Sequence, residues 1–424
     1  MSELANQKVV VVGQGYVGLP VAMRAVEVGF NVVGFDLDQR KIDGLSSGKT
    51  HIDDITDSDV AAALASGRYK PSNEPRAIAG FDIAVITVPT PLRDGAPDLS
   101  YIESSGELLA RFLRPGATVI LESTTFPGTT EEILQPILEE GSGLTAGADF
   151  HLGFSPERID PGNLTWDFQR TPKVVAGVDE ASLKLVQEFY DAIVDTTVPV
   201  SGTREAELTK LLENTFRHVN IALVNELAVH SKALGIDLWE VIAAASSKPF
   251  GFMPFYPGPG VGGHCLPIDP SYLSYKIERQ LGTVSRFVKI ANDVNEHMPD
   301  YVVKRVQLGL NERSKPVKGS RVLVLGIAYK KNSNDARETP ATPVIEQFLA
   351  LGAEVHVHDR HVDGFYELDR SIRRVDLTDE EIEAADVVVL ITDHDDVDYD
   401  GLVEKADYIF DSRHLLSGDN VELL

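Results

Sequence analysis

Three glycines near the start of the chain constrain its fold more than any other feature. Gly13, Gly15 and Gly18 have the spacing G-x-G-x-x-G. An apolar segment over residues 8–12 precedes them and is typical of a buried parallel strand, and a helical apolar period over residues 16–28 follows. A glycine turn between a strand and a helix is the first unit of a doubly wound α/β domain, so the sequence predicts a Rossmann-like lobe here.

The same segment predicts a dinucleotide site. At this spacing Gly13 permits the tight turn, Gly15 lets backbone N–H groups approach a pyrophosphate, and Gly18 lets the helix pack close to the strand. The next predicted strand ends at Asp36, whose carboxylate would accept hydrogen bonds from ribose hydroxyls and repel a 2′-phosphate. The sequence therefore predicts NAD, and not NADP, as the cofactor. The other predicted contacts of this turn are Gln14, Tyr16 and Val17.

The chain divides into three regions by pattern. Strand–helix alternation fills a first region, residues 1–202, which is the expected NAD-binding domain. A helical period without glycine or proline until Gly235 opens a second, helical region, residues 203–312. Residues 313–424 repeat the pattern of the first region without its glycine fingerprint. The predicted fold class is α/β, with two Rossmann-like doubly wound lobes joined by a long-helix α-helical central region.

The charge of the chain limits its partners. Its 424 residues include 39 lysines and arginines against 65 aspartates and glutamates, a formal net charge of −26. A surface this acidic argues against DNA, RNA and anionic membranes as partners. The first residues show no signal-peptide pattern, no apolar run reaches about 18 residues, and a single cysteine excludes an intrachain disulfide. We therefore expect a cytoplasmic protein with no nucleic-acid or membrane partner.

The only cysteine, Cys265, lies in the glycine- and proline-rich stretch PGPGVGGHCLPID, residues 257–269. A cysteine that fills a core belongs on a regular element, whereas this backbone is irregular and can approach a ligand closely. His264 adjoins the thiol, but neighbouring side chains of an extended loop point apart, so we expect no Cys–His dyad. No metal is predicted, because the histidines lack the spacing of zinc ligands and the acidic segment 393–400 lacks the glycine and glutamate of a calcium loop.

Seven segments together resemble one family, the UDP-glucose/GDP-mannose dehydrogenases, which oxidise nucleotide sugars at C6 with NAD. They occur in the family's order and span almost the whole chain: GQGYVGLP, VPTP, ESTTFPGTT, SPERIDPGN, ELTKLLENT, GPGVGGHCLPID and GIAYKKNSNDARETPA. Within the family, SPERIDPGN and the stretch KPFGFMPFYPGPGVGGHCLPIDPSYL are most similar to the UDP-N-acetylglucosamine 6-dehydrogenases. The resemblance implies an NAD-dependent nucleotide-sugar 6-dehydrogenase whose third region binds the UDP-sugar.

The family reaction takes a primary alcohol to a carboxylate in two hydride transfers, with two NAD per sugar and without release of the aldehyde. The resemblance implies that Cys265 traps the aldehyde as a thiohemiacetal, which becomes a thioester that water cleaves. Lys210 and Asn214 are four residues apart on the predicted helix, and they match family residues that stabilise oxyanions beside the cysteine. Asp269 matches an aspartate that shares proton transfer from the alcohol with this lysine.

Further site residues also rest on the resemblance. Glu157 matches a glutamate that activates the hydrolytic water, and Thr124 matches a threonine near the reacting carbon and the nicotinamide. Many relatives have a second glutamate four residues after the first, where this chain has Pro161. The implied cofactor contacts outside the glycine turn are Thr90, Thr124 and Arg337. The implied substrate contacts are Glu157, Lys210, Asn214, Tyr256, Gly260, Gly262, Gly263 and Lys330.

Several alternatives stay open from the sequence. UDP-N-acetylmannosamine, UDP-N-acetylgalactosamine and UDP-glucose share the diphosphate and the C6 alcohol, so the sugar is not fixed. A non-catalytic sensor of nucleotide sugars or NAD on the same fold would not need the thiol. A 3-hydroxyacid dehydrogenase would need neither the cysteine nor the second α/β lobe. A homodimer or higher homo-oligomer is expected, with the helical region as its interface.

Overall fold

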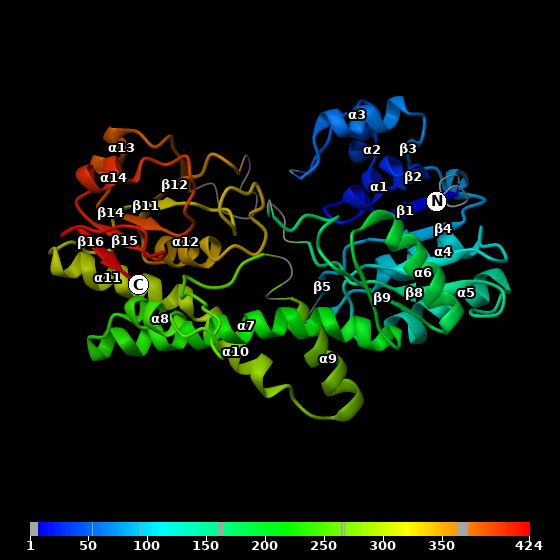
Figure 1. Cartoon of the computed structure of the whole chain (residues 1–424). Helices are drawn as coiled ribbons and strands as arrows, with labels where there is room; N and C mark the ends of the chain where they lie inside the picture. Colours follow the sequence, from blue (N-terminus) through cyan, green and yellow to red (C-terminus); the bar gives the residue numbers. More distant parts are fainter. Residues whose placement is uncertain are drawn as a thin grey trace. The chain divides into compact units, whose positions relative to one another are not determined.

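The computed structural model describes most of the chain: residues 7–52, 54–93, 95–159, 163, 165–263, 266, 268–362 and 372–424. The chain folds into two compact units, Met1–Glu213 with Ser271–Thr283, and Asn214–Pro270 with Val284–Leu424. Each unit contains a mostly or wholly parallel sheet with helices packed against it (Figure 1). This arrangement confirms the predicted α/β fold with two Rossmann-like lobes.

One long helix, α7 (Thr203–Leu234), continues from the first unit into the second. It confirms the helix that the uninterrupted period after residue 202 predicts. The division of the chain into three domains at residues 202 and 312 stays a prediction. Among the described residues, none of the helices combines the length and the apolar character that crossing a lipid bilayer requires.

The described part of the first unit contains an eight-stranded sheet, formed by β1 (Lys8–Val12), β2 (Asn31–Phe35), β3 (Tyr69–Ser72), β4 (Ile83–Ile86), β7 (Thr118–Leu121), β8 (His151–Phe154), β9 (Lys173–Gly177) and β10 (Thr197–Pro199). The strand order is β10-β9-β8-β7-β4-β1-β2-β3. All described neighbours are parallel except the antiparallel pair β8 and β9. The chain order reverses between β1 and β4, and open α/β sheets bind ligands beyond the carboxyl ends of their strands at such a switch point.

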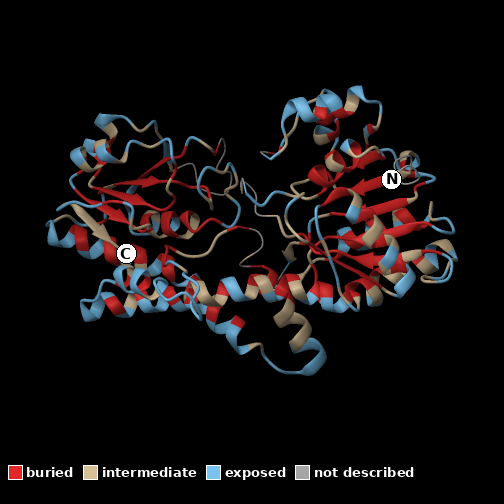
Figure 2. Cartoon of the chain, in the orientation of Figure 1, coloured by how far each residue is buried: buried red, intermediate tan, exposed pale blue. Residues whose placement is uncertain are grey.

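The sequence of the central strand explains its burial. β1 reads KVVVV, and Val9, Val10 and Val11 are fully buried. A strand covered on both faces needs apolar side chains in both directions, and Figure 2 shows the strands of this sheet as buried. The helices of the unit are α1 (Gly18–Glu27), α2 (Gln39–Ser46), α3 (Asp57–Ala65), α4 (Ser100–Ala110), α5 (Gln135–Ser142), α6 (Glu180–Ile193) and α9 (Asp269–Leu281).

The second unit contains, in its described residues, a six-stranded parallel sheet of β11 (Arg321–Leu325), β12 (Glu354–His358), β13 (Arg373–Arg374), β14 (Val387–Leu390), β15 (Ile409–Asp411) and β16 (Val421–Leu423). The order is β13-β12-β11-β14-β15-β16. β11 lies between β12 and β14 as β1 lies between β2 and β4, so the sheet repeats the switch point of the first unit. Its helices are α8 (Leu238–Ser246), α10 (Arg286–Glu296), α11 (Met298–Glu312), α12 (Ala341–Ala350), α13 (Asp379–Ala384) and α14 (Tyr399–Lys405).

Candidate active site

The glycine turn after β1 is crowded at two glycines and open at the third. Gly13 has a φ of +94°, and a Cβ there would lie 2.7 Å from the carbonyl oxygen of Thr87. A Cβ on Gly18 would collide with the carbonyl oxygen of Gly13. Beside Gly15, in contrast, none of the described atoms beyond its chain neighbours lies within 4 Å of an added Cβ. The open space next to these backbone N–H groups fits the pyrophosphate of a dinucleotide.

Asp36, directly after β2, orders the same turn. Its Oδ2 accepts a hydrogen bond from the backbone N–H of Gln14 at 2.9 Å and pairs with Lys41 Nζ at 3.2 Å. Its Oδ1 accepts from the N–H of Asp38 at 2.9 Å. The Gln14 side chain is buried and accepts from the hydroxyl of Tyr69 at 2.7 Å. The acid that the sequence assigns to ribose therefore lies beside the glycine turn and is fixed by two backbone donors.

Tyr16 and Val17 connect the glycine turn to the start of α1. Tyr16 packs against the apolar core of the unit, and Val17 is the residue directly before the helix. Gly13, Gly15, Gly18 and Asp36 thus carry the features that fit a dinucleotide.

Thr90 and Thr124 lie together beyond the carboxyl ends of β4 and β7, which are neighbours in the sheet. Thr90 Oγ1 donates a hydrogen bond to the carbonyl oxygen of Thr124 at 2.8 Å. The hydroxyl of Tyr272, on α9, donates to the carbonyl oxygen of Thr90. Because β4 also neighbours β1, both threonines lie at the same edge of the sheet as the glycine turn.

Glu157 follows β8 and is 7% exposed. Its Oε2 accepts a hydrogen bond from Lys173 Nζ at 3.1 Å, and its Oε1 accepts from the N–H of Ile159. Burial by itself raises the pKa of a carboxyl, but the charge of Lys173, then a hydrogen bond with Glu122, and less strongly the charge of Lys210, hold the pKa of Glu157 below its ordinary value. Lys210, on α7, is buried as well. Glu157 is therefore close enough to Lys210 for the charge of the lysine to affect its pKa.

Lys173 and Glu122 belong to the same cluster, although the sequence analysis assigns neither of them a role. Lys173 begins β9 and is hydrogen-bonded to Glu122, which follows β7 and is fully buried. Glu122 Oε2 accepts a hydrogen bond from the hydroxyl of Tyr190 at 2.6 Å. The available signal was a lysine at the head of an otherwise apolar strand, which needs a buried partner if it points inward.

Two sets of polar contacts hold the loops of this edge against α7. The Glu207 carboxylate, on α7, is buried and accepts hydrogen bonds from the N–H of Gly128 and from the N–H and hydroxyl of Thr130, at 2.9 and 2.7 Å for the latter two. Arg158 pairs with Glu213, also on α7, at 2.6 Å. The segments that carry Thr124 and Glu157 are therefore both anchored to the helix that carries Lys210.

Asn214 and Asp269 come together in the second unit. The amide Nδ2 of Asn214 donates a hydrogen bond to the carboxylate of Asp269, and both side chains are buried. Asn214 lies four residues after Lys210 on α7, so the two side chains share a helix face as predicted. Cys265, which the family resemblance predicts to be the nucleophile, lies outside the described residues, as do His264 and Pro161.

The glycines before the cysteine pack against the second lobe. A Cβ on Gly263, where φ is +87°, would lie 2.8 Å from the ring of Tyr329. A Cβ on Gly262 would lie 2.9 Å from the carbonyl oxygen of Glu338, and Gly260 also has a positive φ. These glycines allow the loop to approach residues 329–338 of the same unit closely, and this packing is a reason for glycine that the sequence did not indicate.

Tyr256 stacks on the ring of Trp239, with centroids 5.2 Å apart, and is 52% exposed. Trp239 in turn stacks on His414 at 4.6 Å. One face of the tyrosine is thus supported by α8, while much of the side chain stays accessible for a flat ligand such as uracil.

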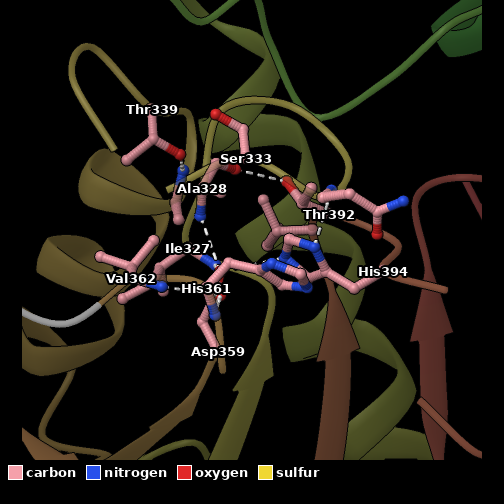
Figure 3. A network of polar contacts seen from close by, with 12 residues as sticks. Ile327, Ala328, Ser333, Thr339, Asp359, His361, Val362, Thr392 and His394 are labelled. Carbon is pink, nitrogen blue, oxygen red and sulfur yellow. Dashed lines mark hydrogen bonds and ion pairs between the residues drawn. The ribbon is translucent and has the colours of Figure 1, made fainter. Parts of the chain in front are cut away.

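Asp359, the acid after β12, accepts hydrogen bonds from backbone N–H groups of its own lobe (Figure 3). Its Oδ2 accepts hydrogen bonds from the N–H groups of Ile327 and Ala328 at 2.8 and 2.9 Å and from His394 Nε2 at 3.0 Å. Burial raises the pKa of this carboxyl, but the hydrogen bonds from His394 and from Ala328 hold it far below its ordinary value. Both lobes therefore use the acid after their second strand to hold the turn after their first strand, and the second lobe adds a histidine to this contact.

Two cationic side chains predicted to contact ligands come after this turn in the chain. Lys330 is half-buried, and Arg337 is an exposed residue whose guanidinium pairs with Asp335 at 2.6 Å. The neighbouring Lys331 pairs with Asp395 of the acidic segment 393–400 at 2.6 Å. Across the described ranges, no group of three or more His, Cys, Asp or Glu side chains could hold a metal ion.

Comparisons with known proteins find domains of one family along the chain. Residues 7–194 match the NAD binding domain of the UDP-glucose/GDP-mannose dehydrogenase family, residues 204–297 its central domain and residues 323–418 its UDP binding domain. Protein CapL of Staphylococcus aureus is 34% identical over 99% of this chain and 98% of its own length. The UDP-N-acetyl-D-glucosamine 6-dehydrogenase of Pseudomonas aeruginosa is 37% identical over 84% of this chain and 83% of its own.

Solved structures show the same fold. The UDP-D-ManNAc dehydrogenase of Pyrococcus horikoshii superposes with a TM-score of 0.89 at 32% identity, covering 98% of both chains. A UDP-glucose dehydrogenase of Pyrobaculum islandicum has a TM-score of 0.87 at 29% identity and covers 99% of this chain and 96% of its own. The relatives therefore share one fold while their names refer to different sugars.

Proposed function

Since the chain belongs to the UDP-glucose/GDP-mannose dehydrogenase family, we propose that it oxidises the C6 alcohol of UDP-N-acetylglucosamine to the uronic acid with NAD. The observation that carries the choice of sugar is the segment SPERIDPGN, residues 155–163, supported by the 37% identity to the Pseudomonas aeruginosa enzyme. Relatives whose names refer to N-acetylmannosamine, N-acetylgalactosaminuronic acid and glucose match at 29–34% identity, so these sugars are the alternatives.

The glycine turn and Asp36 are the proposed cofactor site. When bound, NAD accepts a hydride from the sugar carbon, and two molecules in succession account for the four electrons between an alcohol and a carboxylate. The open space beside Gly15 would take the pyrophosphate, and Asp36 would accept hydrogen bonds from the ribose. Thr90 and Thr124, at the same sheet edge, would line the reacting end of the site.

Cys265 is the proposed nucleophile on the strength of the sequence. Its thiolate forms a C–S bond with the aldehyde carbon, and the carbonyl oxygen takes up a proton. After the second oxidation the adduct is a thioester. A water oxygen then bonds to the same carbon, the C–S bond breaks, and the thiolate leaves while the acid is formed.

The proton transfers are assigned to the buried polar groups around this chemistry. Lys210 and Asn214 would stabilise the oxyanion at C6, and Asp269 with Lys210 would take the proton of the alcohol. The hydrogen bond between Asn214 and Asp269 supports a joint role of these two groups. Glu157 would take the proton of the hydrolytic water, and its lowered pKa supports an ionised carboxylate at neutral pH.

The second lobe is the proposed UDP site. Lys330 would contact the diphosphate, and the exposed Tyr256 would stack on uracil or sugar. Arg337 would contact the cofactor or a paired site only after it leaves Asp335. We further propose that the protein acts in the cytoplasm, where nucleotide sugars and reduced thiols occur together.

A homodimer through the helical region is supported by apolar side chains exposed on α7 and α10. They are Phe216, Leu223, Leu227, Phe287 and Ile290. Size-exclusion chromatography with light scattering tests the assembly, and Leu223→Glu should shift the mass toward the monomer, because a buried charge without a partner destabilises an interface. An unchanged mass would place the interface elsewhere.

One assay tests the substrate and the electron count together. NADH release is followed for UDP-N-acetylglucosamine, UDP-N-acetylmannosamine, UDP-N-acetylgalactosamine and UDP-glucose at equal concentrations. We expect the highest kcat/KM for the first, with two NADH for each sugar consumed. A higher kcat/KM for another sugar would identify that sugar as the substrate. One NADH for each sugar consumed would contradict the four-electron route.

A further inference from the structure

A fully buried lysine connects two buried carboxylates behind the proposed hydrolytic site. Lys173 Nζ is hydrogen-bonded to Glu122 and lies 3.1 Å from Glu157 Oε2. The side chains of all three residues are at most 9% exposed. The rings of Phe168 and Tyr190 cover the ammonium, with centroids at 5.6 and 5.4 Å. The cluster is therefore shielded from water, and each charge in it must be balanced from within.

The groups that face Glu157 come from four elements. They are Glu122 after β7, Lys173 on β9, Tyr190 on α6 through Glu122, and Lys210 on α7. Burial raises the pKa of Glu122 to about 8, whereas the charge of Lys173, the hydrogen bond with Glu122 and the charge of Lys210 hold the pKa of Glu157 below its ordinary value. One cation between two buried carboxyls leaves one proton on the carboxyl pair by charge balance, and the raised pKa of Glu122 favours that residue as its carrier. A neutral Glu122, a cationic Lys173 and an anionic Glu157 leave the cluster without net charge.

We propose that Lys173 is a positioning residue of this enzyme, which holds the Glu157 carboxylate in place for thioester hydrolysis and supplies the buried positive charge that faces it. The inference rests on the proposed role of Glu157. A general base must be unprotonated before the water attacks, and a carboxyl this buried would be protonated near neutral pH without a cation. When the water oxygen bonds to the thioester carbon, its proton passes to Glu157 and the C–S bond breaks. Lys173 then favours release of that proton, because a protonated Glu157 leaves the cluster with a net positive charge.

Lys173→Met removes the cation and keeps an apolar chain of similar length. We expect the acid limb of the hydrolysis rate to move up by about one to three pH units, the usual effect of an opposite charge at this distance, so that the hydrolysis rate falls more at pH 6 than at pH 8. Lys173→Arg should restore most of the rate, because it keeps the cation. Glu122→Gln should change the acid limb by less than about half a pH unit, because it imitates the protonated carboxyl.

The readout separates this step from the oxidations. The enzyme is mixed with UDP-sugar and NAD, quenched in acid, and analysed by intact-protein mass spectrometry for the covalent adduct while NADH is counted. In K173M the burst of NADH should persist and the thioester should accumulate, whereas the wild type should show little adduct. K184M is the matched control, since Lys184 is an exposed lysine of α6 that pairs only with Glu188 at 3.9 Å among the described contacts. Thermal melting shows whether each variant folds.

If K173M does not fold, E122L/K173M replaces the buried pair by apolar groups, which proteins often tolerate, and leaves Glu157 without its cation. The same accumulation of thioester is then expected. An unchanged hydrolysis rate and acid limb in a folded variant without Lys173 overturns the inference. Formation of the acid by Cys265→Ala in the same assay would instead overturn the proposed covalent route, so the two failures are distinguishable.

Discussion

Gly15→Ala tests whether the open side of the glycine turn is the cofactor site. The new Cβ would meet no described atom within 4 Å, and the φ of Gly15 is not positive, so the free protein can accommodate the alanine. Its stability should stay the same or rise by about 0.4–1 kcal/mol, because alanine restricts the unfolded chain. With cofactor the methyl group occupies the space that the pyrophosphate needs. Losing one charge-assisted hydrogen bond costs about 1.5–3 kcal/mol, which weakens the Kd for NAD about ten- to hundredfold.

Gly18→Ala is the matched comparison, because it adds the same methyl group at a glycine that is crowded by neighbouring atoms. Its Cβ would collide with the carbonyl oxygen of Gly13 and lie against the hydroxyl of Thr87. Overpacking of this kind costs about 1–3 kcal/mol, and here a backbone atom has to move, so the upper end of that range applies. We expect the thermal midpoint of the free protein to fall by about 5 °C or more.

Isothermal titration calorimetry measures the Kd for NAD, and differential scanning fluorimetry measures the melting of the free proteins. The two variants should separate: G15A loses affinity at unchanged stability, and G18A loses stability. Wild-type affinity in G15A would show that the pyrophosphate does not lie at this turn. A drop in the melting temperature of free G15A would show that the space beside it is not open.

Three further predictions concern single residues. Cys265→Ala should abolish formation of the acid while leaving the Kd values for NAD and UDP-sugar nearly unchanged, and wild-type acid production would refute the nucleophile. Asp36→Ala should weaken NAD binding by about 2–3 kcal/mol in titration calorimetry, because a hydrogen bond to a charged group is lost. An unchanged Kd would contradict the ribose contact. Burial raises the pKa of Glu207 to about 7 from an ordinary 4.5, so its stabilising contribution is complete below about pH 4.5 and is lost as the pH rises through 7. Glu207→Gln removes this dependence. Its free energy of unfolding should therefore rise by about 3 kcal/mol relative to that of the wild type between pH 4.5 and 8, and melting temperatures of the two proteins that change in parallel over that range would contradict the shift.

Local patterns in the sequence were sufficient for the architecture of both lobes. The valine run of β1, the glycine spacing after it and the acid at Asp36 are contiguous features, and the structure has the strand, the turn and the carboxylate where they predict them. The period over α7 likewise gave a single helix of 32 residues and placed Lys210 and Asn214 on one face. Such features depend on residues a few positions apart, so periodicity and turn chemistry determine them.

The tertiary structure alone decided which charges meet inside the molecule. Glu122 and Glu157 follow two different strands and Lys173 begins a third, and Glu122 and Lys173 are 51 positions apart in the chain. Asp359 follows β12 as Asp36 follows β2, and it is bonded to His394, a histidine 35 positions away in the chain. The order of the strands in a sheet depends on how whole faces of the sheet are buried, which a local segment does not specify. A lysine at the start of a strand therefore does not show in the sequence which carboxylates will neutralise it.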